Sequence, residues 1–289
     1  MKQALMATRR RTQKVAFSLS WGATALTLAF FFIIVAFIAR NGLPVMSIQF
    51  LTDMPRMGMT EGGIFPAILG TFYLMLGSII FALPIGVLGA IYLTEYAKQG
   101  MLMRMIRIGV NSLSGVPSIV FGLFGLSVFV KFMGFGVSIL SGSLTLGILI
   151  LPTIIRASEE ALMAVPHSFR EASLALGATR WQTVRKVVLP AAIPGILTGC
   201  ILGVGRAAGE TAPILFTAAT FYTMRLPGSI FDEVLALPYH IYALMTEGTM
   251  IDKQMPIAYG SALVLLFLVL SFNLAAIIIR MNYARKKQW

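Results

Sequence analysis

Apolar residues gather in six long runs, and shorter polar segments separate them. The runs cover roughly residues 18–38, 67–93, 113–130, 137–155, 195–219 and 257–279. A helix rises about 1.5 Å per residue, so about 20 residues cross the roughly 30 Å hydrocarbon core of a bilayer. Each run is long enough to do so, the third and fourth only barely. The pattern predicts an all-α polytopic membrane protein with six transmembrane helices.

The first run follows a basic N-terminal tail, which resembles the start of a signal peptide. The run is longer than the roughly 7–15 residues of a signal-peptide core, and no clear A-x-A cleavage site follows it. We therefore expect a retained first transmembrane helix.

The basic residues indicate the orientation. Most of the 23 lysines and arginines fall in residues 1–17, 94–112, 156–190 and the end after 279, and few lie in the other connections. Lysine and arginine accumulate on the cytoplasmic side of membrane proteins, so both termini are expected in the cytoplasm. The spread over four segments also argues against nucleic-acid binding, despite the net charge of +12. The predicted units are a basic cytoplasmic tail (1–17), the first helix (18–38), an outer loop (39–63), a core (64–280) that includes a cytoplasmic loop (156–190) and an outer loop (220–256), and a second basic tail (281–289).

Composition excludes several other classes of protein. The chain is 57% hydrophobic and 12% charged, against about 25% charged in soluble domains. Its single cysteine permits no internal disulfide, and His167 and His240 lie far apart, so no metal site is expected. The sequence contains no G-x-x-x-x-G-K-[ST], H-E-x-x-H or G-x-S-x-G pattern, which argues against an ATPase or an intramembrane enzyme.

The cytoplasmic segment 167–190 reads HSFREASLALGATRWQTVRKVVLP. Ser168 and Thr179 are each followed three residues later by a residue that completes a capping box, and Gly177 suits a left-handed helix end. Pro190 is expected to interrupt the backbone bonding of the second helix. Two short helices meeting at a small turn are predicted, either as an ordinary surface hairpin or as a docking element for a soluble partner.

The fifth run contains the charged stretch GRAAGETAP, with Arg206 and Glu210 spaced i, i+4 on one helix face. A charge at the centre of a membrane helix costs about 2.5–3.5 kcal/mol on insertion scales unless it meets a partner or a wet cavity. The pair is either a structural salt bridge or part of a solvated path for an anion. Two small-xxx-small pairs, Gly199/Gly203 and Gly205/Gly209, favour close helix approach nearby.

Two further segments allow alternatives. At the start of the third run, SGVPS contains Pro117, which either unwinds the helix start or sits in its first turn. In the outer loop, SIFDEVLALP is either a short amphipathic helix ended by Pro238 or a surface turn.

The cytoplasmic segment resembles the coupling loop of ABC-importer permeases, which has the pattern EAA-x3-G-x9-I-x-LP. Here Glu171-Ala172-Ser173 is followed by Gly177 and ends at Pro190, with Ser and Val as mild departures. The resemblance implies that these residues and the compact turn residue Ala178 dock on a separate ATPase and transmit its closure.

Four other stretches resemble the phosphate-specific (Pst) branch of these permeases: RAAGETAP, SGVPSIVFGLFG, GIFPAILGT and LPTIIRASEEAL. The likeness runs from about residue 60 to the last span, and the ALPYHIY stretch is more similar to the PstA-type subunit than to PstC. It implies a type I ABC-importer permease fold in a bacterial inner membrane. It also implies a PstC-like second permease, a PstB-like ATPase dimer that binds ATP and magnesium, and a PstS-like binding protein, with no cofactor in this chain. The substrate path implied here includes Ser114, Pro117, Arg206, Gly209, Glu210 and Thr211.

The chemistry of the pair is compatible with phosphate. A guanidinium binds phosphate in a bidentate fork, and Glu210 can accept a hydrogen bond from the proton that phosphate retains at neutral pH and sulfate lacks. Alternatively, Glu210 holds Arg206 between transport cycles. A permease for sulfate or molybdate, or a passive anion channel, remains the alternative function.

Overall fold

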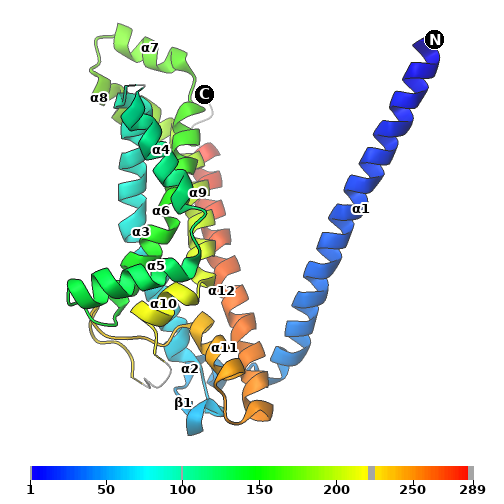
Figure 1. The fold of residues 1–289 in the computed structure, drawn as a ribbon, viewed down its shortest axis with the longest axis vertical. Coiled ribbons are helices and arrows are strands. Elements are labelled where there is room, and N and C mark those ends of the chain that lie inside the picture. Colours follow the sequence, from blue (N-terminus) through cyan, green and yellow to red (C-terminus); the bar gives the residue numbers. More distant parts are fainter. Residues whose placement is uncertain (1, 99, 221–224, 286–289) are drawn as a thin grey trace.

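The computed structural model describes residues 2–98, 100–220 and 225–285 as an almost entirely helical chain (Figure 1). Its only sheet among these residues is the two-stranded antiparallel pair β1 (Pro55–Arg56) and β2 (Glu61–Gly62). The helices are α1 (Lys2–Gly42), α2 (Ile48–Thr52), α3 (Phe65–Ile91), α4 (Met101–Leu113), α5 (Ser118–Gly125), α6 (Ile139–Met163), α7 (His167–Ala175), α8 (Arg180–Thr183), α9 (Leu189–Gly209), α10 (Ala212–Thr217), α11 (Leu237–Thr246) and α12 (Ile251–Arg285); short 3-10 turns are η1 (Leu43–Val45) and η2 (Met57–Met59), and π-helical turns are η3 (Tyr92–Tyr96), η4 (Leu126–Phe132) and η5 (Val184–Val188).

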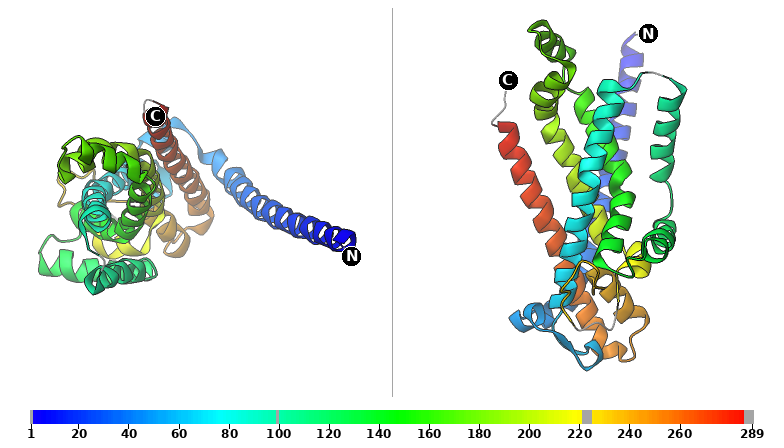
Figure 2. Two further views of the ribbon diagram at one scale, coloured as in Figure 1. Left: turned by 90° about the horizontal axis from the view of Figure 1, so that it is seen from above. Right: turned by 90° about the vertical axis from the view of Figure 1, so that its left-hand side faces the viewer.

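Long apolar helices form the bundle. Five of them, within the described ranges, are long and apolar enough to cross a membrane, and the bent pair α4–α5 raises the number to six. The chain is thus a multi-pass membrane protein, as its sequence predicts. α3, α6 and α9 pack at the centre, with α12 against α9 (Figures 1 and 2).

Small residues let the central helices approach closely. A methyl group on Gly86 of α3 would lie 2.7 Å from the Ile154 side chain of α6. Gly199 of α9 faces Ala157 of α6 in the same way, which confirms the close approach expected at the Gly199/Gly203 pair. Lipid tails are as apolar as leucine, so helices in a bilayer associate mainly through such tight packing.

α1 diverges from the bundle and touches it only near one end (Figures 1 and 2). There Gly42 lies against the backbone of Tyr259 in α12, and the Phe37 and Tyr259 rings meet edge to face at 5.6 Å. None of the apolar window of α1 is buried within the chain. The basic tail and the predicted first span form one continuous helix, and α12 likewise continues through most of the second basic tail, whose residues 286–289 lie outside the described part.

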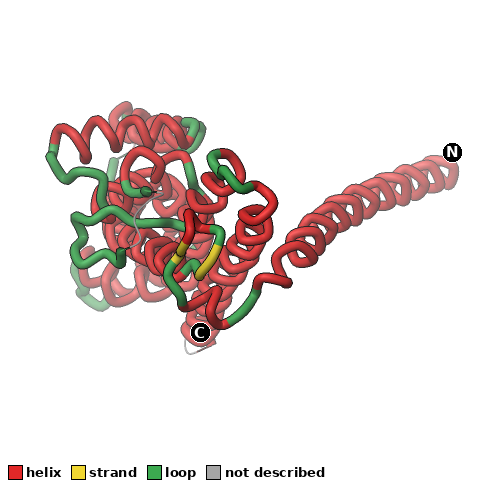
Figure 3. The backbone as a smooth tube through the Cα atoms, turned by 90° about the horizontal axis from the view of Figure 1, so that it is seen from below, coloured by secondary structure: helices red, strands yellow, loops and turns green. Residues whose placement is uncertain are grey.

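The loops and strands gather at the end of the bundle opposite α7 and α8, which we call the outer end (Figure 3). The SIFDEVLALP stretch is a turn there, not a helix. The Asp232 carboxylate accepts hydrogen bonds from the backbone N–H groups of Gly228 and Ser229, and Val234 bridges to Ala219. Pro238 lies in the first turn of α11, so this proline begins a helix and does not end one. Residues 221–224 of the predicted outer loop are outside the described ranges.

Two predicted spans are broken. The third is bent by 103° between α4 and α5, and its first arm, α4, occupies residues that the charge pattern had placed in a cytoplasmic loop. Pro117 is the N-cap of α5, directly before its first turn, so the chain turns sharply at SGVPS. The fifth span breaks after Gly209, where Glu210 is extended and α10 follows.

Candidate translocation site and coupling hairpin

The break between α9 and α10 holds the predicted ion pair. Arg206 lies in the last turn of α9, and the Glu210 backbone is extended (φ −76°, ψ 126°) because the helix has ended. The Arg206 Nε donates to Glu210 Oε1 at 3.4 Å, with 37% and 16% of the two side chains exposed. The pairing predicted from the i, i+4 spacing is confirmed, although Glu210 is a helix cap and not a member of the helix.

This contact leaves most of the Arg206 guanidinium free. A guanidinium carries five N–H donors, and one long contact uses only one of them. At 3.4 Å the contact is also longer than the usual 2.7–3.2 Å of an N–H···O hydrogen bond. An oxyanion arriving at Arg206 therefore competes against a weak partner, which makes this arginine suitable for transient anion binding.

α5 forms one wall beside the break. A methyl group on Gly122 would lie 2.9 Å from the Ala212 carbonyl oxygen of α10, and one on Gly125 would lie 2.8 Å from the Thr217 side chain. The glycines of the VFGLFG stretch thus bring α5 against α10 at backbone distance. Val116 and Phe121 also share a buried cluster with Ala207, the neighbour of Arg206.

The other residues of the predicted path divide into two groups. Gly209 is exposed with open space around its Cα, and Thr211 is half-buried at the N-cap of α10, so both lie at the break with Arg206 and Glu210. Ser114 and Pro117 lie at the α4–α5 bend. The Ser114 hydroxyl donates to the Asn111 carbonyl. The assignment of these residues to a substrate path stays a prediction.

We call α7, the turn 176–179 and α8 with η5 the coupling hairpin, after the role that the sequence predicts for them; it lies at the end of the bundle where α3 and α12 also end (Figure 1). Its turn has the predicted geometry. Gly177 has φ +82°, its N–H donates to the Leu174 carbonyl, and the Ala178 N–H donates to the Ser173 carbonyl. This is the double bonding of a Schellman end, which needs a left-handed residue.

One of the two predicted capping boxes is present. Thr179 and Gln182 exchange both hydrogen bonds, at 2.8 and 3.3 Å. The box at Ser168 and Glu171 is wrong, because α7 already begins at His167 after the N-cap Pro166 and Ser168 lies inside the helix. Proline lacks an N–H and has a fixed φ that suits the start of a helix. Pro166 therefore occupies the N-cap position that the sequence pattern assigned to Ser168.

The second arm of the hairpin is not a separate short helix. α8, η5 and α9 form one helix of 30 residues from Arg180 to Gly209, so Pro190 does not end it. Pro190 removes one backbone hydrogen-bond donor from the helix. The π-helical turn η5 lies just before it and widens the helix, as a π-bulge does where backbone hydrogen bonds are rearranged. The residues Glu171, Ala172 and Ala178 lie on the surface of the hairpin or half-buried in it.

Ser173, the departure from the EAA pattern, joins the two arms. Its hydroxyl lies 2.9 Å from the Thr183 hydroxyl of α8. The turn residue Leu176 is 89% exposed and Trp181 is 51% exposed. A rigid hairpin with a large exposed apolar side chain at its tip is a suitable docking element.

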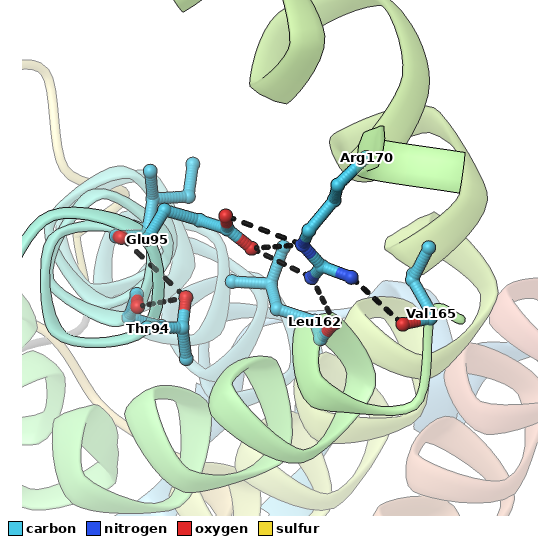
Figure 4. Close-up of polar contacts among 7 residues, drawn as sticks. Thr94, Glu95, Leu162, Val165 and Arg170 are labelled. Carbon is cyan, nitrogen blue, oxygen red and sulfur yellow. Dashed lines mark hydrogen bonds and ion pairs between the residues drawn. The ribbon is translucent and has the colours of Figure 1, made fainter. Parts of the chain in front are cut away.

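A second connection, which the sequence did not predict, ties the hairpin to α3 (Figure 4). Arg170 of α7 donates to both Glu95 carboxylate oxygens, at 2.6–3.3 Å, and to the carbonyl oxygens of Val165 and Leu162 at 2.7 and 2.9 Å. Only 15% and 10% of the Arg170 and Glu95 side chains are exposed. We call this pair the Arg170–Glu95 latch. Because the two residues are 75 positions apart, no local pattern in the sequence signals it.

Metal binding has no support in the described part of the chain, where no three His, Cys, Asp or Glu side chains come together as ligands.

Comparisons with known proteins support this architecture. The family described as "Binding-protein-dependent transport system inner membrane component" matches residues 82–288. The chain is 38% identical to the probable ABC transporter permease protein YqgI of Bacillus subtilis, over 93% of this chain and 95% of that protein. It is 37% identical to the phosphate transport system permease protein PstA 1 of Mycobacterium tuberculosis, over 78% and 72%. Its fold is similar to that of a chain of a bacterial alginate ABC transporter, with a TM-score of 0.66 and 15% identity over 91% and 92% of the two chains.

Proposed function

We propose that this chain, which belongs to the family of binding-protein-dependent transport system inner membrane components, is the PstA-type permease subunit of an ATP-driven inorganic phosphate importer. Its similarity to a PstA protein and its permease fold support this function. The observation that carries it is Arg206, a guanidinium at a helix break inside a membrane span, held by one 3.4 Å contact and one-third exposed.

Phosphate binds at this break in three steps. It first enters beside Gly209, where no side chain intervenes. The free donors of Arg206 then bind two of its oxygens, which the planar fork of arginine favours over a lysine ammonium. Finally, the Glu210 carboxylate accepts the hydrogen of a protonated phosphate oxygen, or turns aside until the anion leaves and then pairs with Arg206 again.

Two connections carry force from the coupling hairpin to this site. The 30-residue helix that starts at Arg180 contains Arg206 in its last turn, so movement of the hairpin reaches the break through one rod. The Arg170–Glu95 latch joins the hairpin to the end of α3 as well. Tyr96 lies in η3 with Glu95, and the Arg180 guanidinium is 5.8 Å from the centre of its ring.

The proposed partners follow from this role. A PstC-like permease forms the other half of the path, and a PstS-like protein delivers phosphate at the outer end. A PstB-like ATPase dimer, which binds ATP and magnesium, grips the coupling hairpin through Glu171, the turn at Gly177 and the exposed Leu176. The complex resides in a bacterial cytoplasmic membrane, with the hairpin in the cytoplasm.

Phosphate uptake by the complete complex in proteoliposomes tests the site. Arg206→Gln is expected to lower ATP-dependent uptake at least tenfold, because the anion loses its guanidinium. Arg206→Lys should recover part of it, since the charge stays and the fork is lost. Arg40→Gln, at an exposed position of α1, is the matched control with unchanged uptake. Normal uptake by Arg206→Gln at low phosphate would refute the site, and uptake without ATP would favour a channel.

Glu210→Gln separates the two roles of the glutamate. If Glu210 accepts the phosphate proton, the variant should lose discrimination between phosphate and sulfate while retaining transport. If it only restrains Arg206, discrimination should stay and the rate should change. Selective transport of sulfate or molybdate by the unaltered complex would overturn the choice of substrate and leave the permease assignment intact.

A further inference from the structure

A second charged cluster lies between α4 and α6 toward the hairpin end of the bundle. Arg107 Nη2 of α4 is 3.6 Å from Glu159 Oε1 of α6, and Arg156 of α6 donates to the Asn111 side-chain oxygen of α4. Apart from Met103, the residues of α4 are exposed or half-buried, so these polar contacts contribute to holding the helix in place. The cluster lies apart from the Arg206 break and nearer the coupling hairpin.

The cluster lines a partly open cavity of about 280 Å³. A water molecule takes up about 30 Å³ of liquid, so the space accommodates a tetrahedral oxyanion together with some of its water. The polar and flexible side chains of the wall are Arg107, Asn111, Arg156, Glu159, Glu160 and Met163. Two guanidiniums and an amide face the same small space from two helices.

The donors of Arg107 are largely unused. Its Nε is buried and has no hydrogen-bond partner, and its one ion pair is long at 3.6 Å with 42% of the side chain exposed. Arg170 is the internal comparison, because there Nε, Nη1 and Nη2 all have partners within 3.3 Å. An arginine with all three nitrogens satisfied is structural. An arginine with a buried free donor beside a cavity has capacity for a ligand, since buried polar groups without a partner are costly.

The position of Arg107 links the cavity to the bend. Arg107, Asn111 and Ser114 recur at intervals of four and three, so they form one stripe along α4. The stripe leads from the cavity to the turn at SGVPS, whose Val116 packs in the same cluster as Ala207. Polar side chains thus extend along α4 from the bend toward the hairpin end.

We propose that Arg107, with Asn111 and Arg156, forms a second and weaker binding station for inorganic phosphate on the cytoplasmic side of the path. This station rests on the proposed transport function and adds a site to it. Phosphate displaces Glu159 from Arg107 there, as it displaces Glu210 from Arg206. The negative charges of the two glutamates in the wall offset the positive charges of the two arginines, so phosphate binds weakly. Weak binding suits a release site, because conduction requires an ion to leave as well as to enter.

Protection of a cysteine reporter tests the station without requiring transport. The reporter is Met163→Cys, at an exposed wall position, in a chain in which the buried Cys200 is replaced by alanine. The complete complex without ATP is treated with N-ethylmaleimide, with phosphate replacing chloride at constant ionic strength, and this chain is then separated from its partners on a gel. Phosphate is expected to slow labelling at least threefold, at millimolar concentrations.

Substitutions in the reporter chain decide the assignment. Arg107→Gln should abolish the protection, and Glu159→Gln should shift it to at least threefold lower phosphate because the competing carboxylate is gone. Arg104→Gln, an exposed arginine one turn away and outside the wall of this cavity, should leave it unchanged. Absence of protection in the unsubstituted reporter, or equal protection after Arg107→Gln, would overturn the station.

Uptake assays separate this proposal from the proposed function. If the unaltered complex imports phosphate and Arg107→Gln lowers its maximal rate while ATP hydrolysis continues, both stand. If the complex imports phosphate and Arg107→Gln changes nothing, the station fails and the function stands. If the unaltered complex imports no phosphate, the function fails, whatever the labelling shows.

Discussion

The Arg170–Glu95 latch supports a quantitative prediction, because each of its atoms has a defined partner. Arg170→Met keeps most of the side-chain length. It removes the contacts of Arg170 with four acceptors, which are the two Glu95 oxygens and two backbone carbonyl oxygens. Glu95→Gln keeps the shape and one acceptor oxygen, replaces the other oxygen by an amide NH2 group and removes the charge. Comparing the two separates the ion pair from the hydrogen bonds to the end of α6.

The expected cost follows from burial. Two charges about 4 Å apart attract by about 4 kcal/mol at the effective dielectric constant of about 20 that suits such sites. Removing one partner of a buried pair costs about 3–5 kcal/mol. With 15% and 10% of the side chains still exposed, we expect about 3 kcal/mol for Arg170→Met. Glu95→Gln should cost less, about 1–2 kcal/mol, because the amide oxygen and both carbonyls still accept hydrogen bonds.

The double variant should cost about 2 kcal/mol less than the sum of the single variants, because the pair can be broken only once. The free energies of unfolding are measured by denaturing-detergent titration of the chain in bicelles, with Lys186→Gln, an exposed hairpin residue, as the control. The same variants in the full complex should hydrolyse more ATP per phosphate moved, because α3 no longer follows the hairpin. Additivity within about 0.5 kcal/mol, or unchanged stoichiometry in all variants, would refute the latch.

Three further predictions concern single positions. Gly177→Ala should destabilise the hairpin by about 1 kcal/mol through its left-handed backbone alone, since nothing lies within 4 Å of a Cβ there; Gly177→Asn should cost less, and a thermal shift of the isolated chain measures both. Burial lowers the pKa of His240, in α11 outside the spans, to about 4. The free energy of unfolding should therefore be full above pH 6.5 and fall by about 3 kcal/mol as the pH drops toward 4. His240→Leu should flatten this pH profile, and an unchanged slope would contradict the assignment. Gly125→Ala should impair folding or uptake because its methyl would meet Thr145 and Thr217, whereas Gly89→Ala, with open space, should have no effect; equal behaviour in an expression and uptake assay would argue against tight α5 packing.

The sequence predicted well what depends on local pattern. The long apolar runs correspond to helices because a bilayer requires continuous apolar surface and internal backbone bonding. The left-handed Gly177 and the capping box at Thr179 were predictable for the same reason, since each depends on residues within one turn. The Arg206–Glu210 contact also followed from spacing, although the helix ends between the two residues.

The sequence failed where a distant or neighbouring group competes with the local pattern. The two arginines of α4, Arg104 and Arg107, led to its placement in a loop, whereas they lie on a helix, and Arg107 has its partner charge, Glu159, on α6. Pro166 occupies the N-cap position assigned to Ser168 and makes no side-chain capping bond. The Arg170–Glu95 latch joins residues 75 positions apart, and only the folded chain reveals such a pair.

In the proposed coupling mechanism, the unbroken helix from Arg180 to Gly209 makes chain length itself important. Inserting one residue between the hairpin and Arg206 would rotate the arginine by about 100° about the helix axis and move it by about 1.5 Å. The guanidinium would then point away from the break even though every original side chain remained. A substitution at most positions of this segment changes only packing. A single insertion or deletion changes the direction in which the Arg206 guanidinium points relative to the hairpin. We therefore expect the number of residues between Thr179 and Glu210 to matter for transport as much as their identity.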